Sequence, residues 1–308
     1  MDSSLSEKEV ERRLIQDFPL YFLEMNEAQE RFIRAKNKDG QTPRRRLWES
    51  GNKAGKTHGG IAEDLAHAFG KRYWLEDTDP DYLVEIRIPN RGIVGCETMM
   101  HSVPEKIWPT FKELIPQTCV YRTKKNPSGQ VHRISFETDP EGNKCQSEIH
   151  LRSYDQDADT FEGIDANWYH WDEPPPKRIL QAAERGKIVT NAPSWFTMTP
   201  LKEAYIYDEY SLKAFNFGGE DPEIAVIRGE IWENCIDWCF KCRLDIPENR
   251  EIDPDTQILR RPVKRCPQCN RAMGFITKAG IDEYLKTLDP EERKAREKGL
   301  WKHLSGLV

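Results

Sequence analysis

The spacing of apolar and polar residues in the first quarter of the chain predicts helices around one short strand. SEKEVERRLIQDFPLYFLEM and NEAQERFIRAKNK both have helical spacing. In the second segment, Asn26 and Gln29 are spaced as a capping box, which predicts a helix start there. A short strand at 46–49 precedes a glycine-rich loop, and KTHGGIAEDLAHAFGKRYW is helical again. The order is therefore strand, glycine loop, helix.

The middle of the chain alternates between strand-like and helix-like segments. The strand-like ones are DYLVEIRIPNRGIVGCE, NWYHWDE and SWFTMTP, and HRISFETDPEGNKCQSEIHLRSYD alternates around residues 140–143 as a hairpin does. Helices are predicted for VPEKIWPTFKELIP and KRILQAAERGKIV, and for the charged tail AGIDEYLKTLDPEERKAREKGLWKHL. This alternation favours an α/β fold with a mainly parallel central sheet.

The loop ESGNKAGKT resembles a phosphate-binding loop. Its spacing fits G-x-x-x-x-G-K-[ST], except that Ser50 stands where the first glycine is usual. Backbone N–H groups of the loop and the helix N-terminus behind it would face phosphate oxygens. Lys56 would reach the β- and γ-phosphates and the Thr57 hydroxyl would hold Mg²⁺. A glycine turn before a helix is the alternative. The predicted nucleotide-binding residues are Ser50, Gly51, Asn52, Lys53, Ala54, Gly55, Lys56 and Thr57.

Two adjacent acids follow the strand NWYHW. At the carboxyl edge of an open α/β sheet, Asp172 would hold Mg²⁺ and Glu173 would polarise the attacking water. Three prolines at 174–176 end the strand because they lack an N–H for the ladder. The alternative is an ordinary acidic turn. The residues expected to pack rather than to react are Trp168, His170 and Trp171.

The segment WFTMTPL supplies a pair of hydroxyl groups. Thr197 and Thr199 share one face of the predicted strand, where they could sense the γ-phosphate and couple it to motion. Threonine is also simply a good strand former. Phosphate loop, acidic pair and hydroxyl pair nevertheless occur in this order, each at a strand end. Their combination predicts a Mg²⁺-dependent ATPase in which Lys56, Asp172 and Glu173 carry the chemistry.

Composition excludes several classes of protein. The chain has 308 residues, of which 32% are charged, and its net charge is −6. A surface that coats nucleic acid throughout is therefore not expected, although a local basic track is compatible with this balance. No apolar run is long enough to cross a bilayer, and the charged N-terminus does not resemble a signal peptide, so we expect a cytosolic protein without a membrane partner.

Five of the eight cysteines lie between residues 235 and 269, and clustering of this kind in a cytosolic protein indicates metal. The pattern C-x-x-C…C-x-x-C predicts a zinc ribbon with four thiolate ligands: Cys239, Cys242, Cys266 and Cys269. Cys235 falls outside this pattern, and Cys96, Cys119 and Cys145 are expected to be ordinary thiols.

The simplest role of the cysteine-rich segment is structural, with the metal holding together a loop that has little core. Contact with DNA or portal is the alternative, suggested by nearby basic residues, namely Arg260, Arg261, Lys264, Arg265 and Arg271.

LWESGNKAGKT, DADTFEGIDANWYHWDEPP and FTMTPL resemble the Walker A, Walker B and coupling motifs of the terminase large subunits of tailed bacteriophages. The resemblance extends over nearly the whole chain apart from the cysteine insertion. It implies a P-loop NTPase fold of the RecA/ASCE type and a motor that hydrolyses ATP with Mg²⁺ to move double-stranded DNA into a procapsid. It also implies a homo-oligomeric ring, contacts with the portal protein and the terminase small subunit, and a place in the cytoplasm of the infected host rather than in the mature virion.

The resemblance also implies roles for single residues. Lys53 stands where many terminases carry an arginine for the γ-phosphate, although lysine lacks the planar fork. Gln29 resembles a glutamine that reads adenine, and a capping role explains it equally well. The position before Gly163, where some members carry an arginine finger, is Glu162 here. Arg152 and Arg185 are the nearest alternatives for that finger.

The family resemblance predicts three segments: an ATPase core with an N-terminal helical part over 1–234, a zinc-ribbon-like insertion over 235–275, and a C-terminal helical lid over 276–308 that leads toward a nuclease. No aspartate set for a nuclease follows in this chain, so we expect no DNA cleavage by it. Two other functions remain open at this point. One is a helicase-like, nucleic-acid-dependent ATPase, and the other is a zinc-ribbon adaptor with a vestigial phosphate loop.

Overall fold

A computed structural model describes residues 7–162 and 164–301. The chain forms two compact units, each built from two segments. The first unit is Met1–Glu24 with Thr57–Ser194, and the second is Met25–Lys56 with Trp195–Val308. The division into 1–234, 235–275 and 276–308 stays a prediction.

Five of the described strands belong to the first unit: β2 (Arg91–Cys96), β3 (Tyr121–Lys125), β4 (Val131–Phe136), β5 (Glu148–Ser153) and β6 (Trp168–Asp172). β2 pairs in parallel with β5 and β6, whereas β4 is antiparallel to β3 and β5. The predicted hairpin is confirmed, with β4 and β5 as its arms. The strand-like segment after Asp81 forms a strand only from Arg91, beyond Pro89, which has no N–H to donate.

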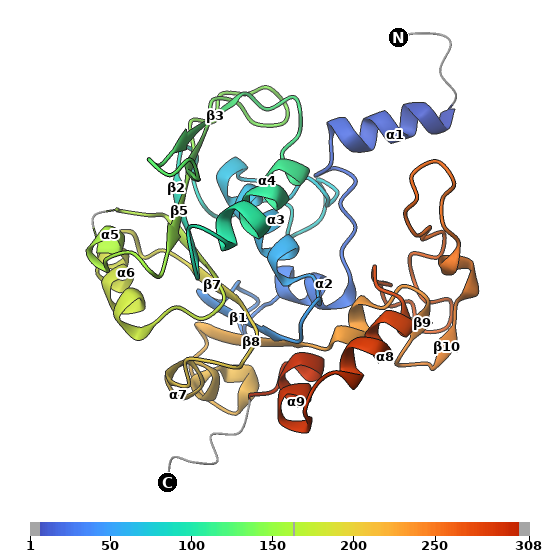
Figure 1. The fold of residues 1–308 in the computed structure, drawn as a ribbon. Helices are drawn as coiled ribbons and strands as arrows, with labels where there is room; N and C mark the ends of the chain where they lie inside the picture. Colours follow the sequence, from blue (N-terminus) through green and yellow to red (C-terminus); the bar gives the residue numbers. More distant parts are fainter. Residues whose placement is uncertain (1–6, 163, 302–308) are drawn as a thin grey trace. The chain divides into compact units, whose positions relative to one another are not determined.

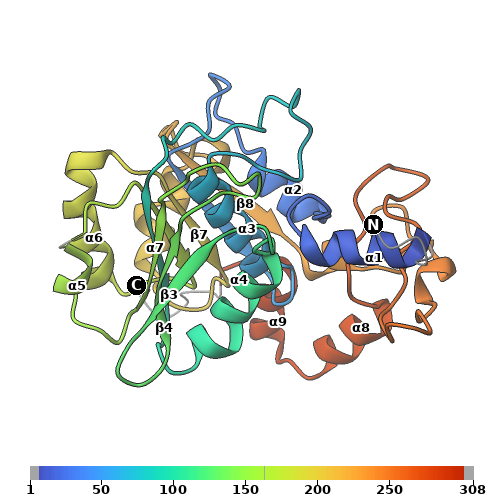
Figure 2. The ribbon, with the colours of Figure 1, turned by 90° about the horizontal axis from the view of Figure 1, so that it is seen from above.

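The helices of the first unit are α1 (Glu7–Asp17), α3 (Lys56–Phe69, of which Lys56 belongs to the second unit), α4 (Trp108–Leu114), α5 (Asp159–Glu162) and α6 (Lys177–Thr190). Figures 1 and 2 show α3 and α4 on one face of this unit's strands and α5 and α6 on the other. The predicted helix over 103–116 is divided, because a π-helical turn, η1 (Val103–Ile107), precedes α4. There the Trp108 N–H donates five residues back, to the Val103 carbonyl.

Tryptophans fill the core of the first unit. Trp168 and Trp171 of β6 are fully buried, which confirms that they pack. They lie over two glycines of β2, where no side chain fits. A Cβ on Gly92 would be 2.0 Å from the Trp168 ring, and one on Gly95 would be 2.6 Å from the Trp171 ring. The glycines of RGIVGC therefore let two large rings approach the sheet.

The second unit contains β1 (Arg45–Ser50), β7 (Ser194–Met198, of which Ser194 belongs to the first unit) and β8 (Ile224–Gly229). β1 and β8 are parallel, from Arg45 opposite Ile224 to Ser50 opposite Gly229. The helices of this unit are α2 (Glu27–Ile33), α7 (Tyr205–Glu209), α8 (Lys278–Lys286) and α9 (Pro290–Lys298). The capping box at the start of α2 is confirmed: Asn26 and Gln29 each accept from the other's backbone N–H.

Short elements complete the second unit. They are 3₁₀ turns η2 (Ser211–Lys213), η3 (Phe215–Phe217), η4 (Ile231–Asn234) and η5 (Pro247–Arg250), with a small hairpin of β9 (Trp238–Cys239) and β10 (Leu244–Asp245). The order of strands in the main sheet is β3-β4-β5-β2-β6-β7-β1-β8. The predicted α/β fold with a mainly parallel central sheet flanked by helices is confirmed. β3 and β8 were not predicted.

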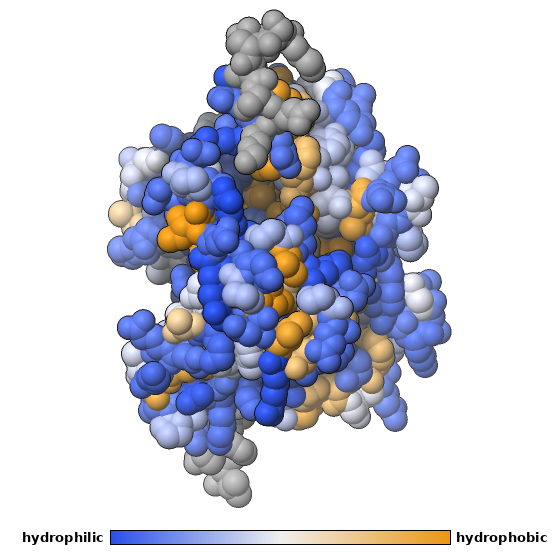
Figure 3. Space-filling model, turned by 90° about the vertical axis from the view of Figure 1, so that its right-hand side faces the viewer, coloured by the Kyte–Doolittle hydropathy of each residue, from blue (hydrophilic) through white to orange (hydrophobic). Residues whose placement is uncertain are grey.

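The surface is largely polar where Figure 3 shows it. Apolar side chains form small groups there, separated by hydrophilic ones. Within the described ranges, no helix has the length and apolar character that crossing a membrane requires.

Candidate functional site

The glycine loop of the second unit closes around the ammonium group of Lys56. Lys56 Nζ donates to the carbonyls of Ser50, at 3.1 Å, and Gly51, at 2.7 Å. Two residues of the loop have left-handed backbone, Lys53 with φ 58° and Gly55 with φ 85°. A lysine in that conformation is strained, which is common where a loop is shaped for a ligand. The loop therefore has a defined turn around its lysine.

Three side-chain amides hold three successive carbonyls of this loop. Asn234 Nδ2 donates to the Lys53 carbonyl at 2.6 Å. Asn26 Nδ2 donates to the Ala54 carbonyl at 3.0 Å, and Gln29 Nε2 to the Gly55 carbonyl at 3.1 Å. The three donors are Asn26, Gln29 and Asn234, and all are buried. We call them the amide bracket.

The amide bracket fixes the direction of the backbone N–H groups. In a planar trans peptide, the carbonyl of one residue and the N–H of the next point in opposite directions. Carbonyls held by the bracket at 53–55 therefore turn the N–H groups of residues 54–56 the other way. Successive N–H groups on one side of a loop before a helix N-terminus form an anion-binding concavity. The second unit thus carries the donors that a phosphate group needs.

Ser50 explains why the loop departs from the usual spacing. It is the last residue of β1 and is fully buried, and its hydroxyl donates to the Gly229 carbonyl at 2.7 Å. Gly51 is the position at which glycine is required, because a Cβ there would lie 2.2 Å from the Arg296 carbonyl of α9. That carbonyl accepts from the Asn52 N–H at 2.9 Å. The start of the loop therefore rests on the end of α9.

A buried carboxylate lies directly before the loop. Glu49 is fully buried and accepts from the Ser211 hydroxyl, from Trp301 Nε1 at 2.8 Å and from Arg228 Nε at 3.4 Å. Burial raises the pKa of Glu49. The three donors lower it by less, so the pKa stays above its usual value. No spacing in the sequence indicated this group, because its partners are distant along the chain.

In the first unit, the helix that follows the loop contacts the acidic strand end. Thr57 Oγ1, in the first turn of α3, donates to Asp172 Oδ1 at 2.9 Å. Lys106 Nζ, in η1, donates to the other oxygen, Oδ2, at 2.7 Å. The structure therefore brings together two residues that the sequence assigned to Mg²⁺. It adds Lys106, for which no motif gave a signal.

The electrostatics of this group favour an ionised Asp172. Burial alone would raise the pKa of Asp172, but the charges of Lys106 and His170 and the hydrogen bonds from Lys106 and Thr57 lower it below the usual value of 3.8. Burial by itself would lower the pKa of Lys106. The charge of Asp172 and its hydrogen bond to Lys106 outweigh this effect of burial, so the pKa of Lys106 is raised. Behind them, His170 Nδ1 lies 2.8 Å from Asp64 Oδ2, both fully buried. An ionised carboxylate beside a hydroxyl is a suitable donor set for Mg²⁺.

Glu173 has a left-handed backbone, with φ 71°. The Tyr154 hydroxyl lies 2.8 Å from the Glu173 carbonyl and 3.0 Å from the Gly95 carbonyl, and it can donate to either. Arg178 in turn donates to the Tyr154 carbonyl at 3.0 Å. Strained backbone held by neighbours is typical of functional positions. Tyr154 is a further residue that sequence reasoning did not identify.

The remaining predicted residues have these places. Thr197 and Thr199 are buried, and the Thr199 hydroxyl donates to Asn52 Oδ1 of the loop at 3.2 Å. The Gln29 amide accepts from the Asn26 N–H in the capping box through Oε1 and donates to the loop through Nε2. Recognition of adenine by Gln29 stays a prediction.

Of the arginine-finger candidates, Arg152 is partly buried in β5, and Arg185 is 68% exposed and pairs with Glu162. Gly163 lies outside the described residues.

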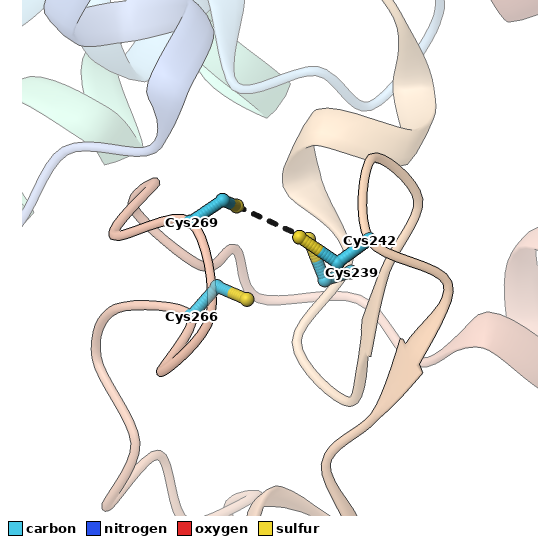
Figure 4. A group of neighbouring side chains, drawn as sticks. All are labelled: Cys239, Cys242, Cys266 and Cys269. Atoms are coloured by element: carbon cyan, nitrogen blue, oxygen red, sulfur yellow. Dashed lines mark hydrogen bonds between the residues drawn. The ribbon is translucent and has the colours of Figure 1, made fainter.

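The four predicted zinc ligands lie together (Figure 4). The sulfurs of Cys239, Cys242, Cys266 and Cys269 are all within 4.8 Å of one another. Cys239 Sγ and Cys269 Sγ are 3.7 Å apart. Four thiolates at the usual Zn–S distance would have sulfurs about 3.8 Å apart. The group therefore fits Zn²⁺. Cys235 is elsewhere, in an apolar cluster with Ile231, Ile281 and Leu285.

Basic residues near the cysteines have partners within the unit. Arg265 bonds Glu30, and Arg260 lies 3.4 Å from Asp253. Arg271 is buried over the Phe240 ring, and Arg261 lies over Phe275. These contacts are what a structural segment requires. Contact with DNA or portal stays a prediction.

Comparisons with known proteins give a likeness of fold. The sequence matches no protein-family model and no curated protein. Two crystal forms of the large terminase from a thermophilic bacteriophage are similar in structure. Form 2 aligns with TM-score 0.55 at 13% identity, over 91% of this chain and 54% of that one. Form 3 aligns with TM-score 0.51 at 12% identity, over 90% and 53%. This chain spans about half the length of that terminase, and at this identity the likeness concerns the fold.

Proposed function

We propose that this protein is a Mg²⁺-dependent ATPase. The observation that carries the proposal is the contact between Thr57 and Asp172, 2.9 Å between hydroxyl and carboxylate oxygens. Thr57 follows Lys56 in the first turn of α3, so the residue that meets the acidic strand end is joined directly to the lysine of the loop. A vestigial loop has no need of this pairing.

Each residue then has a defined task. Lys56 exchanges the carbonyls of Ser50 and Gly51 for phosphate oxygens, and the N–H groups turned inward by the amide bracket bind the same phosphates. Thr57 and the ionised Asp172 hold Mg²⁺ and its water shell. Bound Mg²⁺ supplies charge neutralisation on the phosphate oxygens. Glu173 polarises the attacking water.

We further propose that hydrolysis drives double-stranded DNA into a procapsid, as a ring of identical subunits. The fold shared with a phage large terminase supports this, together with the order of the three motifs. The Thr199 hydroxyl donates to Asn52 of the loop. A residue that relays the phosphate state needs such a contact with the loop. The portal protein and a terminase small subunit are the partners that such a motor requires.

Turnover and binding of ATP, measured separately, test the ATPase. Glu173→Gln should lower turnover by about 100-fold or more while calorimetry gives wild-type affinity for Mg²⁺·ATP. Glu220→Gln, an exposed position, should leave both unchanged. Wild-type turnover in Glu173→Gln would remove Glu173 from the mechanism, and a wild-type protein that does not bind Mg²⁺·ATP would overturn the ATPase. Turnover unaffected by DNA and procapsids together would refute the motor.

A further inference from the structure

Residues 235–275, here called the cysteine module, leave and rejoin the second unit at one point. The Asn234 carbonyl accepts from the N–H groups of Phe275 and Ile276, both at 2.9 Å. The Gly274 N–H donates to the Cys235 carbonyl at 2.9 Å. Packing at this point is so close that a Cβ on Gly274 would lie 2.0 Å from the Asn234 carbonyl carbon. Asn234 is thus the base at which both ends of the module are fastened.

The side chain of Asn234 reaches the phosphate loop. Its Nδ2 donates to the Lys53 carbonyl at 2.6 Å, and its Oδ1 accepts from Asn26 Nδ2 at 3.1 Å. Asn234 is only 6% exposed, so both bonds are shielded from water. One residue therefore fastens the cysteine module, holds the Lys53 carbonyl and contacts Asn26, a second member of the amide bracket.

The cysteine module has little apolar core of its own. Its buried cluster is Cys239, Ile246, Cys266 and Met273, so half of it consists of predicted metal ligands. Small segments of this kind depend on metal for a fixed shape. Cys239 follows Asn234 by five residues, and Cys269 precedes Phe275 by six. A metal bound by both cysteine pairs therefore links the two ends of the module close to Asn234.

A second connection runs from the cysteine module to the amide bracket. Arg265, next to the ligand Cys266, bonds the carboxylate of Glu30 in α2. α2 also carries Gln29, whose amide donates to the Gly55 carbonyl. The Arg265–Glu30 pair is exposed and adds little stability by itself. It does connect the residue next to Cys266 to the helix that carries Gln29.

We propose that the cysteine module is an internal brace of the phosphate loop, and that Asn234 is the positioning residue through which bound metal keeps the loop shaped for a triphosphate. Loss of the metal frees the base of the module, and the Lys53 carbonyl loses its partner. The N–H groups of residues 54–56 then lose their common direction. This inference rests on the proposed ATPase only where it concerns ATP, since the shape of the loop can be measured without nucleotide.

Three forms of the full chain test the brace. Asn234→Asp removes the donor to Lys53 and leaves all four cysteines in place. Cys266→Ser removes one ligand, and chelation of wild-type protein followed by zinc addition removes and restores the metal without substitution. Gln257→Glu, the same change of amide to carboxylate at an exposed site in the module, is the control. Zinc content, Mg²⁺·ATP affinity and hydrogen–deuterium exchange of the 50–57 peptide are measured for each.

The expected pattern separates the brace from a merely structural role. Asn234→Asp should keep its zinc, exchange faster in the 50–57 peptide and bind Mg²⁺·ATP more weakly by about five-fold or more, because it removes one buried hydrogen bond and places a carboxylate oxygen against the Lys53 carbonyl. Cys266→Ser and the chelated protein should show the same changes without zinc, and added zinc should reverse them only in the chelated wild type. Wild-type exchange in the loop of the metal-free protein, or in Asn234→Asp, would overturn the brace. A wild type that binds no ATP, yet whose loop exchange rises on chelation, would overturn the ATPase alone.

Discussion

Removing the charge of Lys106 should destabilise the protein in a pH-dependent way. Lys106→Met keeps most of the stem and deletes the ammonium, which lies 2.7 Å from Asp172 Oδ2. The Asp172 side chain is 3% exposed and that of Lys106 is 42% exposed. The variant therefore leaves a buried carboxylate without the positive charge that lies beside it in the wild type.

The size of the effect follows from the two exposures. Breaking a fully buried ion pair costs about 3–5 kcal/mol, whereas an exposed pair is worth about 1 kcal/mol or less. Here one partner is buried and the other lies partly in water. Water can therefore solvate the carboxylate oxygen that loses the ammonium, and we expect the free energy of unfolding to fall by about 1–3 kcal/mol. In a chain of this size that corresponds to a Tm lower by about 2–5 °C.

The pH dependence has a defined sign. In the wild type the pKa of Asp172 is lowered, so its ionised form contributes stability above the unfolded value of 3.8, and this contribution is lost as pH falls through the folded pKa. In Lys106→Met, burial without the ammonium should raise the pKa of Asp172. The difference in stability between the two proteins should therefore be full at neutral pH and become smaller as pH falls toward the ordinary range of aspartate.

Urea unfolding between neutral and acid pH measures this difference. Lys112→Met, at an exposed position of the adjacent helix α4, is the matched control and should leave stability within about 0.5 kcal/mol of wild type. A loss in Lys106→Met that is equal to the control, or that is constant with pH, would refute the reasoning.

Three further substitutions test the site. Gly51→Ala places a Cβ 2.2 Å from the Arg296 carbonyl; it should lower the Tm and weaken Mg²⁺·ATP binding, and unchanged calorimetry would show that α9 does not constrain the loop. Tyr154→Phe removes the hydroxyl 2.8 Å from the Glu173 carbonyl; kcat should fall about five- to ten-fold at constant ATP affinity, whereas an affinity change alone would contradict a positioning role. Ser50→Ala removes the 2.7 Å hydrogen bond to β8 and should cost about 1 kcal/mol in urea unfolding; an unchanged free energy of unfolding would show that this bond does not stabilise the protein.

Local chemistry determined much of this protein from the sequence alone. Periodicity identified the strand before the loop, the strands β6 and β7, the hairpin of β4 and β5, and the helices α3 and α6. The spacing of Asn26 and Gln29 predicted the capping box, and the two C-x-x-C pairs predicted that four cysteines lie together. These signals are legible because each depends on residues close together along the chain. β8 was missed because it is a short apolar run without alternation, and β3 because its residues are polar and exposed.

Only the tertiary structure decided which distant residues complete the site. Lys106 reaches Asp172 from a π-helical turn 66 positions away, and Asn234 reaches Lys53 across 181. Neither has a motif, since a single lysine or asparagine carries no spacing to recognise. The left-handed backbone of Glu173 and the close approach of α9 to Gly51 likewise depend on what packs beside them. Sequence determines chemistry that is local along the chain, whereas contacts across the sheet and between layers arise only when the chain has folded.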